Sequence, residues 1–217
     1  RQTRVGSPTD RMVPPVDVDG ATIFVSRAGQ GVFELAYTQL QQAYQANDLA
    51  ILARHLVATP RAMAYDQAAR LLHIVMADGS LATLTLYRAE EVTAWTRQET
   101  DGVVQAVAEA GGTIWLAVER EGGLRLERLD ATLGLDAAMS ASSTTPQEGW
   151  SGLAHLEGRT VAVLADGAPR DGAFVLSGAV TLDPPAATVQ VGLPFTHEIE
   201  PLPPPGGTQR LVSATFR

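Results

Sequence analysis

The segment LLHIVM-ADGS-LATLTLY, residues 71–87, decides the fold class of this chain. Two apolar runs, Leu71–Met76 and Leu81–Tyr87, flank a tetrapeptide that contains Asp78-Gly79. An Asp-Gly step between two such runs suits the primed turns that match the twist of β-strands. The segment therefore predicts an antiparallel β-hairpin.

The same alternation of apolar runs and turns continues on both sides of this hairpin. Upstream, Ala21–Arg27 and Val32–Thr38 flank a glycine-rich turn. Downstream, the expected strands are Thr93–Gln98, Val103–Ala108, Thr113–Glu119 and Leu124–Leu129. Strands that arrive about every ten residues are typical of a sandwich, a barrel or a propeller. We expect an all-β, mainly antiparallel fold with one short helix.

That helix is predicted over about residues 47–57. Its apolar residues fall at i, i+3, i+4 and i+7, which places them on one helical face. They are Leu49, Leu52, Ala53 and Leu56. An Asn-Asp pair opens the segment and can accept hydrogen bonds from the free N–H groups of a first turn.

Changes in pattern divide the chain into five segments. They are an extended lead-in over 1–20, an antiparallel β platform of partial propeller-like or sandwich form over 21–130, a Ser/Thr-rich linker over 131–150, a small β-barrel over 151–203, and a returning strand over 204–217. The barrel is indicated by short strands separated by glycines. We expect the returning strand to pair outside the barrel, with a strand of the first β unit. Because the chain begins with Arg1 instead of Met, we also expect it to be a fragment of a longer product.

Composition excludes several classes of protein. Hydrophobic residues make up 45 % and charged residues 18 % of the chain, which is the composition of a folded domain. The absence of cysteine excludes disulfides, thiolate metal sites and a cysteine nucleophile. A net charge of −8 without a basic stripe argues against tight nucleic-acid binding. No apolar run reaches the ~18 residues of a membrane span, so we expect none.

Two glycine-containing motifs resemble catalytic or cofactor signatures but depart from them. Gly29-Gln30-Gly31-Val32-Phe33-Glu34 lacks the third glycine of a dinucleotide fingerprint and lies in an expected hairpin. Gly149-Trp150-Ser151-Gly152-Leu153 has its closing glycine out of place for a nucleophile elbow. We interpret the first as a turn and Ser151 as a linker or strand-entry residue.

The histidines and paired carboxylates give no metal or catalytic pattern either. His55, His73, His155 and His197 lie far apart in the sequence, without a second histidine at i+2 or i+4. His55 is expected to favour the C-terminal dipole of the predicted helix. The carboxylate pairs Glu90-Glu91 and Glu198/Glu200 leave open a hydrolase with dispersed carboxylates, since a glycosidase needs two carboxyls across a cleft.

Aromatic residues and Asp-Gly turns have two alternative roles each. The aromatic set could stack on sugars, but core or interface packing is the commoner role on alternating strands. Its members are Trp95, Trp115, Trp150, Tyr37, Tyr44, Tyr65 and Tyr87. Asp78-Gly79 and Asp166-Gly167 are predicted to be structural turns, since a calcium site needs about six to eight oxygen ligands. The sequence thus predicts no catalytic residue, no cofactor and no metal.

A set of short strings occurs in a familiar order along residues 13–217. They are Ile23–Gly29, Phe33–Tyr37, Asp48-Leu49, His55-Leu56, Ala77–Leu81, Ala94–Arg97, Asp101-Gly102, Gly152–Arg159, Val163–Gly167 and Val191–Phe195. In this order the chain resembles the tail tubular protein B, or nozzle, family of short-tailed phages, which is related in role to the packaged-DNA stabilisation proteins. Members of that family are considerably longer, so the first β unit is expected to be an incomplete propeller.

The resemblance implies a virion tail component and not an enzyme. It implies a ring homo-oligomer of six copies that contacts neighbouring tail or portal-adaptor proteins, assembled in the bacterial cytoplasm. DNA would pass through the ring without sequence-specific binding. An acidic chain suits this role, because contacts with phosphates would slow the passage of DNA. The alternative is a glycan-binding β module of a tail or cell-surface protein.

Overall fold

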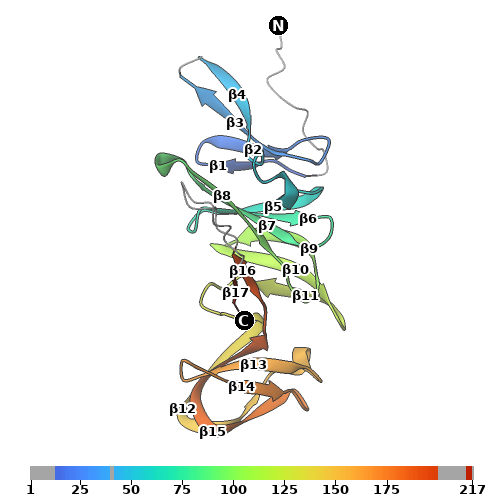
Figure 1. Ribbon diagram of the computed structural model, residues 1–217, viewed down its shortest axis with the longest axis vertical. Coiled ribbons are helices and arrows are strands. Elements are labelled where there is room, and N and C mark those ends of the chain that lie inside the picture. The colour runs from blue at the N-terminus through green and yellow to red at the C-terminus, as the bar shows by residue number, and fades with distance from the viewer. Residues whose placement is uncertain (1–12, 40–41, 200–213, 217) are drawn as a thin grey trace, which may run out of the picture. The chain divides into compact units, whose positions relative to one another are not determined.

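A computed structural model of the chain describes residues 13–39, 42–199 and 214–216 (Figure 1). Its strands pair antiparallel throughout the described residues, which confirms the all-β prediction. The chain divides into two compact units, Arg1–Leu129 and Asp130–Arg217. No helix in the described part of the chain is long and apolar enough to cross a membrane.

Unit 1 consists of three sheets that follow one another along the chain (Figure 1). The first contains β1 (Val16–Val18), β2 (Ala21–Val25), β3 (Val32–Thr38) and β4 (Ala43–Asp48). The second contains β5 (Pro60–Asp66), β6 (Leu71–Met76), β7 (Leu81–Tyr87) and β8 (Val92–Gln98). The third contains β9 (Val103–Ala110), β10 (Thr113–Arg120) and β11 (Gly123–Arg128). Each sheet is a meander whose strands are neighbours in chain order.

The central strands of the second sheet, β6 and β7, are buried on both faces. Along β6, Leu72, Ile74 and Met76 belong to a core cluster shared with the first sheet. Val75 points to the opposite face and belongs to a cluster shared with the third sheet. A strand buried on both faces reads as a continuous apolar run, which is why residues 71–76 lack a polar alternation.

Two predictions for unit 1 are wrong. Residues 47–57 contain the end of β4, a turn and a single turn of 3₁₀ helix, η1 (Arg54–Leu56), in place of an α-helix. The apolar residues of the predicted helix do not share one buried face: Ala53 is buried, whereas Leu52 is exposed. The extended lead-in of residues 1–20 includes β1, which pairs with β2, so part of it belongs to the first sheet.

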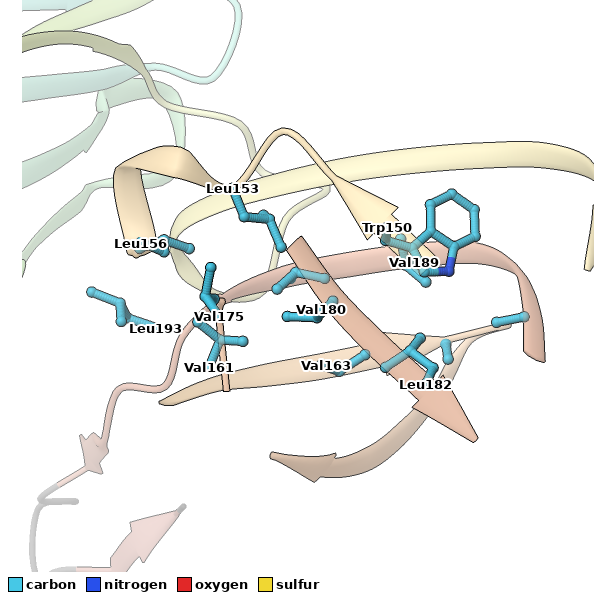
Figure 2. Close-up of a cluster of buried hydrophobic side chains, with 13 residues drawn as sticks. Trp150, Leu153, Leu156, Val161, Val163, Val175, Val180, Leu182, Val189 and Leu193 are labelled. Atoms are coloured by element: carbon cyan, nitrogen blue, oxygen red, sulfur yellow. The ribbon is translucent and has the colours of Figure 1, made fainter. Parts of the chain in front are cut away.

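Unit 2 contains a fourth, open sheet with the strand order β12-β15-β13-β14. Its strands are β12 (Asp136–Ser151), β13 (Thr160–Ala165), β14 (Ala168–Phe174) and β15 (Ala179–Leu193). Figure 2 shows the core of this unit, in which Trp150 packs with aliphatic side chains such as Val180 and Val189. Between β12 and β13 lies a short 3₁₀ turn, η3 (Ala154–Leu156).

Three predictions for unit 2 need correction. The expected linker over 131–150 is mostly β12, an edge strand whose register shifts between Ser142 and Gln147, where Pro146 is tolerated. The expected barrel over 151–203 does not close, because β12 and β14 remain as the two edges of the sheet. The returning strand is β17 (Ala214–Phe216), and it pairs with β16 (His197–Ile199) of unit 2, not with the first β unit. Residues 204–213 and 217 lie outside the described residues.

Candidate functional site

An open groove of about 790 Å³ runs along the first strands of the three sheets of unit 1. It is lined by residues of β1, β5 and β9 and of the turns that follow β5 and β9. These three strands lie side by side, since β5 contacts both β1 and β9. The groove is therefore formed by equivalent strands of three successive sheets.

Three carboxylates line this groove, one from each first strand. Asp17 accepts a hydrogen bond from the Thr22 hydroxyl at 2.9 Å. Asp66 accepts a hydrogen bond from the Ala69 N–H at 2.9 Å, and Glu109 accepts one from the Gly112 N–H at 2.8 Å, each from the turn that follows the acid. Each acid thus stabilises its own hairpin, and no three Asp, Glu or His side chains in the described part of the chain gather as a metal site. The groove has a negatively charged wall.

An ion-pair network joins the first sheet to the second next to this groove. Arg88 of η2 (Arg88–Glu90) donates through Nε to Glu34 Oε1 at 2.7 Å and also through Nη2. Asp19 Oδ2 lies 3.6 Å from the guanidinium nitrogens of both Arg70 and Arg88. Glu34 belongs to the first sheet and Asp19 to its first turn, whereas Arg70 and Arg88 follow strands of the second sheet. These ion pairs therefore link the two sheets.

Tyr65, which lines the groove, has a buried hydroxyl without a hydrogen-bond partner among the described residues. Burial, followed by the negative charge of Asp19, raises the pKa of this phenol. The hydroxyl therefore stays protonated at neutral pH and remains a donor. Sequence reasoning grouped Tyr65 with possible sugar-stacking residues and did not associate it with acidic residues of a groove.

His73 is buried in the second sheet within a short polar network. Its Nδ1 lies 3.0 Å from Thr83 Oγ1, and that hydroxyl donates to Gln98 Oε1 at 2.9 Å. Because the Thr83 hydroxyl donates its proton to Gln98, it accepts the hydrogen bond from His73. The imidazole proton of His73 therefore lies on Nδ1. Burial lowers the pKa of His73, with a smaller opposing effect from Asp66. This histidine is a neutral structural residue.

A stability loss on acidification follows from this lowered pKa. The unfolded chain takes up the His73 proton below about pH 6.5, whereas the folded chain resists it until lower pH. The contribution of neutral His73 to the free energy of unfolding is therefore complete above about pH 6.5. It is lost as the pH falls below that value towards the lowered pKa of the folded state. We expect unit 1 to lose more stability between about pH 7 and pH 5 than the His73→Gln variant does. Urea unfolding at each pH measures this difference, and equal pH profiles for the two proteins would contradict it.

The two glycine motifs have structural positions. Gly29-Gln30-Gly31 forms the turn between β2 and β3, where the Gly29 N–H donates to the Ser26 carbonyl at 2.8 Å. This confirms the hairpin interpretation. Ser151 is the last residue of β12, and Leu153 beyond it is buried in the core of unit 2. Ser151 thus ends a strand, although we expected it to lie in a linker or to enter a strand.

The remaining histidines and the carboxylate pairs are dispersed. His55 is an exposed residue of the single 3₁₀ turn η1, so it does not lie at the C-terminal end of an α-helix as expected. His155 Nε2 lies 2.9 Å from the Ala137 carbonyl. The ring of His197 contacts that of Phe195. Glu90 lies in η2 and Glu91 follows it, whereas Glu198 lies in β16 and Glu200 is outside the described residues.

The aromatic residues have separate surroundings. Trp95 donates from Nε1 to the Leu49 carbonyl at 2.9 Å and packs on the core between the first two sheets. Trp150 is buried in unit 2, with its Nε1 unpaired among the described residues. Tyr87 lies under the Arg70 guanidinium at 4.6 Å. Tyr37 and Tyr44 are exposed neighbours on β3 and β4, in edge-to-face contact at 5.4 Å. These two rings form an exposed aromatic pair at the end of the first sheet.

Both Asp-Gly steps are hairpin turns, as predicted, but of different types. Asp166 and Gly167 both have positive φ, 50° and 79°, as a primed turn requires. Gly79 alone has positive φ, 82°, and its N–H donates to the Met76 carbonyl, so this turn is a type I turn closed by a glycine bulge. Asp78 Oδ1 accepts from the Ser80 N–H and hydroxyl, which lowers the pKa of the carboxyl.

The outer face of the third sheet is an exposed apolar surface. On β10, Ile114, Leu116 and Val118 point into the core, so the alternate residues Trp115 and Ala117 lie on the other face. The same outer face carries Ala106 and Ala108 on β9 and Leu124 and Leu126 on β11. Glu119 and Arg128 lie on the same face in the neighbouring rows, so its apolar part is the row Ala106–Ala117–Leu126 together with the exposed Leu124. Exposed leucines of this kind are a candidate interaction surface.

Comparison with known proteins found no family model and no curated protein that matches this chain.

Proposed function

We propose that this chain is a structural component of a phage-type virion tail, of the nozzle or hub class. It would form part of the DNA exit channel and a platform for other tail proteins. The observation that supports this best is the architecture of unit 1: three stacked sheets, of which the last exposes Leu124 and Leu126 at its edge. Exposed leucines of this kind suit assembly, and the proposal that the assembly is a tail nozzle rests on the ordered strings that resemble that family.

In this proposal the three sheets are successive blades of an incomplete propeller. Propeller blades are four-stranded meanders arranged around a central channel. The first and second sheets have four strands each, and their first strands, with that of the third sheet, line one groove. An acidic wall of Asp17, Asp66 and Glu109 would repel phosphates, which suits a surface near passing DNA.

The proposal includes a ring of identical copies, six by the resemblance, in contact with neighbouring tail or portal-adaptor proteins. Its location is the virion tail after assembly in the bacterial cytoplasm, and it has no catalytic role. The acids of the groove are consistent with a structural role, because each accepts a hydrogen bond from its own hairpin.

Purified particles test the proposal directly. Mass spectrometry of virions made by the phage that encodes this chain should detect it at a fixed ratio to the portal protein. Antibody labelling in the electron microscope should place it on the tail. Absence from gradient-purified particles, with the portal protein present as the control, contradicts the proposal.

Glycan binding is the second candidate, and the Tyr37–Tyr44 pair favours it. Two exposed rings in edge-to-face contact offer apolar surface with a polar hydroxyl at each end. If this pair binds sugars, a glycan array should show binding that Tyr37→Ala removes and Tyr87→Phe keeps. An array without any binder at high protein concentration eliminates this candidate.

A further inference from the structure

We propose that Asp171 is a site of spontaneous covalent modification, at which an isoaspartyl linkage to Gly172 forms while unit 2 stays folded. Aspartate before glycine is the sequence most prone to this reaction, because glycine has no side chain to shield its amide nitrogen. The chain contains five such steps, which begin at Asp19, Asp78, Asp101, Asp166 and Asp171. The structure restrains the first four and leaves the fifth open. This inference is independent of the proposed function.

The reaction needs no partner molecule except water. The backbone nitrogen of the glycine attacks Cγ of the aspartate and forms a C–N bond, and the hydroxyl of the carboxylic acid leaves as water together with the amide proton. Water then opens the resulting succinimide ring. Opening at one carbonyl restores aspartate, whereas opening at the other leaves a backbone that runs through the side-chain carbon. The step therefore requires a carboxyl group that can turn towards the next amide, and an amide nitrogen that is not held elsewhere.

Hydrogen bonds hold the carboxylates of Asp78 and Asp166 in place. Asp78 Oδ1 accepts from the Ser80 hydroxyl at 2.6 Å and from the Ser80 N–H at 3.0 Å. Asp166 Oδ1 accepts from the Thr188 N–H at 2.8 Å and the Ala187 N–H at 3.0 Å. Bonds of this kind stabilise the ionised carboxylate, and those from Ser80 and Thr188 lower the pKa of the two acids. Both carboxyls thus have less of the protonated form that reacts.

Backbone bonds and an ion pair restrain the other steps of unit 1. The attacking nitrogen at the Asp78 step is engaged, because the Gly79 N–H donates to the Met76 carbonyl at 3.0 Å. At the Asp101 step the Gly102 N–H donates to the carbonyl of the preceding threonine at 2.8 Å. Asp19 Oδ2 lies 3.6 Å from each of two guanidinium groups.

Asp171 and Gly172 have none of these restraints. Asp171 is exposed, and its carboxylate accepts no hydrogen bond and forms no ion pair among the described residues. In the register of β13 and β14, Arg170 and Ala173 have partners, whereas the two residues between them have none and form a bulge opposite Ala162. Since β14 is an edge strand, no second strand pairs with the bulge. The carboxyl group is free to turn at a point where the ladder is interrupted.

The product would loosen one edge of the sheet of unit 2. An isoaspartyl linkage lengthens the backbone of β14 by one carbon between the two segments that pair with β13. Strand β13 is also paired with β15, so the core of the sheet keeps its partners. We therefore expect faster hydrogen exchange in β14 of the modified chain, with β13 and β15 unchanged.

Peptide mapping of the full chain, stored folded at neutral pH for several weeks, tests the proposal. Endoproteinase Asp-N cuts before aspartate but not before isoaspartate, so a modified site appears as a missed cleavage of unchanged mass. Isoaspartate at Asp171 should accumulate several-fold faster than at any of the other four aspartates. A sample stored in guanidinium chloride is the control, because the five steps then have no structure and their rates should converge.

Two asparagine variants separate the effect of the structure from that of the sequence. Asparagine forms the same succinimide but releases ammonia, so the mass of the protein reports its reaction. Asp171→Asn and Asp166→Asn are matched, because each places asparagine before glycine in unit 2. An amide oxygen at position 166 can still accept from the Ala187 and Thr188 N–H groups. In the folded chain Asp171→Asn should deamidate several-fold faster, and in guanidinium chloride the two rates should be similar.

Three results overturn the inference. One is isoaspartate at another step that accumulates as fast as at Asp171 in the folded chain. Another is an equal rate of deamidation in the two folded variants. The third is a folded chain without isoaspartate at Asp171 when the sample in guanidinium chloride has formed it there, because the bulge would then protect the step. Circular dichroism of each stored sample checks that the chain is still folded.

Discussion

Gly79→Ala is expected to lower the free energy of unfolding of unit 1 by about 3 kcal/mol, through strain and overpacking together. Gly79 has φ of 82°, where any Cβ is strained. A Cβ at this position would lie 2.4 Å from Val103 Cγ1 and 3.0 Å from Val103 Cα. The Gly79 carbonyl also accepts from the Val104 N–H at 3.0 Å. The substitution would therefore displace β9 from the turn of the second sheet.

Gly167→Ala is the matched control for the strain alone. Gly167 has φ of 79°, but a Cβ there would meet no atom within 4 Å. We expect a loss of about 1 kcal/mol in unit 2. Hydrogen exchange of peptides from β6–β7 and from β13–β14 reports on the two units separately within the full chain. Equal losses in the two variants would contradict a specific contact of Gly79 with Val103.

The hairpins of unit 1 are predictable because their determinants are local. Asp78-Gly79 lies between two apolar runs, and turn chemistry of this kind acts over a few residues. Asp19-Gly20 after the alternating Val16–Val18 is a signal of the same kind, and it marks the turn from β1 to β2. The prediction of an extended lead-in is wrong over Val16–Gly20, because it rests on the prolines of that segment and not on this turn, and residues 1–12 lie outside the described residues.

The errors concern segments whose structure depends on distant partners. Leu49–Leu56 has helical spacing, yet Leu52 of that pattern is 92 % exposed, and Ala50 and Val57, which are not part of it, pack in the core between two sheets. Residues 136–151 have low intrinsic strand preference, but β15 supplies a long partner strand for them. Tertiary contacts overrode local preference in both segments.

The candidate site is less predictable than the fold. The groove depends on β1, β5 and β9 lying side by side, which no single segment encodes. The apolar end face does leave a signal, since Thr113–Val118 is apolar at nearly every position and such a strand has two apolar faces. Whether its outer face is exposed depends on the presence of another sheet beyond the third one, and the sequence pattern of β10 does not contain that information.

Glu127→Gln is expected to lower the free energy of unfolding of unit 1 by about 2 kcal/mol, because it removes the negative charge opposite the largely buried Arg120 guanidinium, which also donates to the Asp101 carbonyl at 2.8 Å. Arg120 Nε and Nη2 donate to the two Glu127 oxygens at 2.6 and 2.8 Å. The Arg120 side chain is 7 % exposed, whereas that of Glu127 is 25 % exposed. The pair joins β10 to the edge strand β11, so its loss should also weaken the face that carries Leu126.

The two partners differ in burial, so their removal should differ in cost. Arg120→Met leaves a carboxylate that water can reach, and we expect it to lose only about 1 kcal/mol. The double variant Arg120→Met/Glu127→Leu should be more stable than Glu127→Gln alone, because it removes the buried positive charge together with its carboxylate partner. Asp78→Asn, which weakens an exposed pair with Arg97 at 3.0 Å, should change stability by less than about 0.5 kcal/mol. Urea unfolding of the four variants ranks them, and a Glu127→Gln effect no larger than that of Asp78→Asn would show that the buried pair is not important for unit 1.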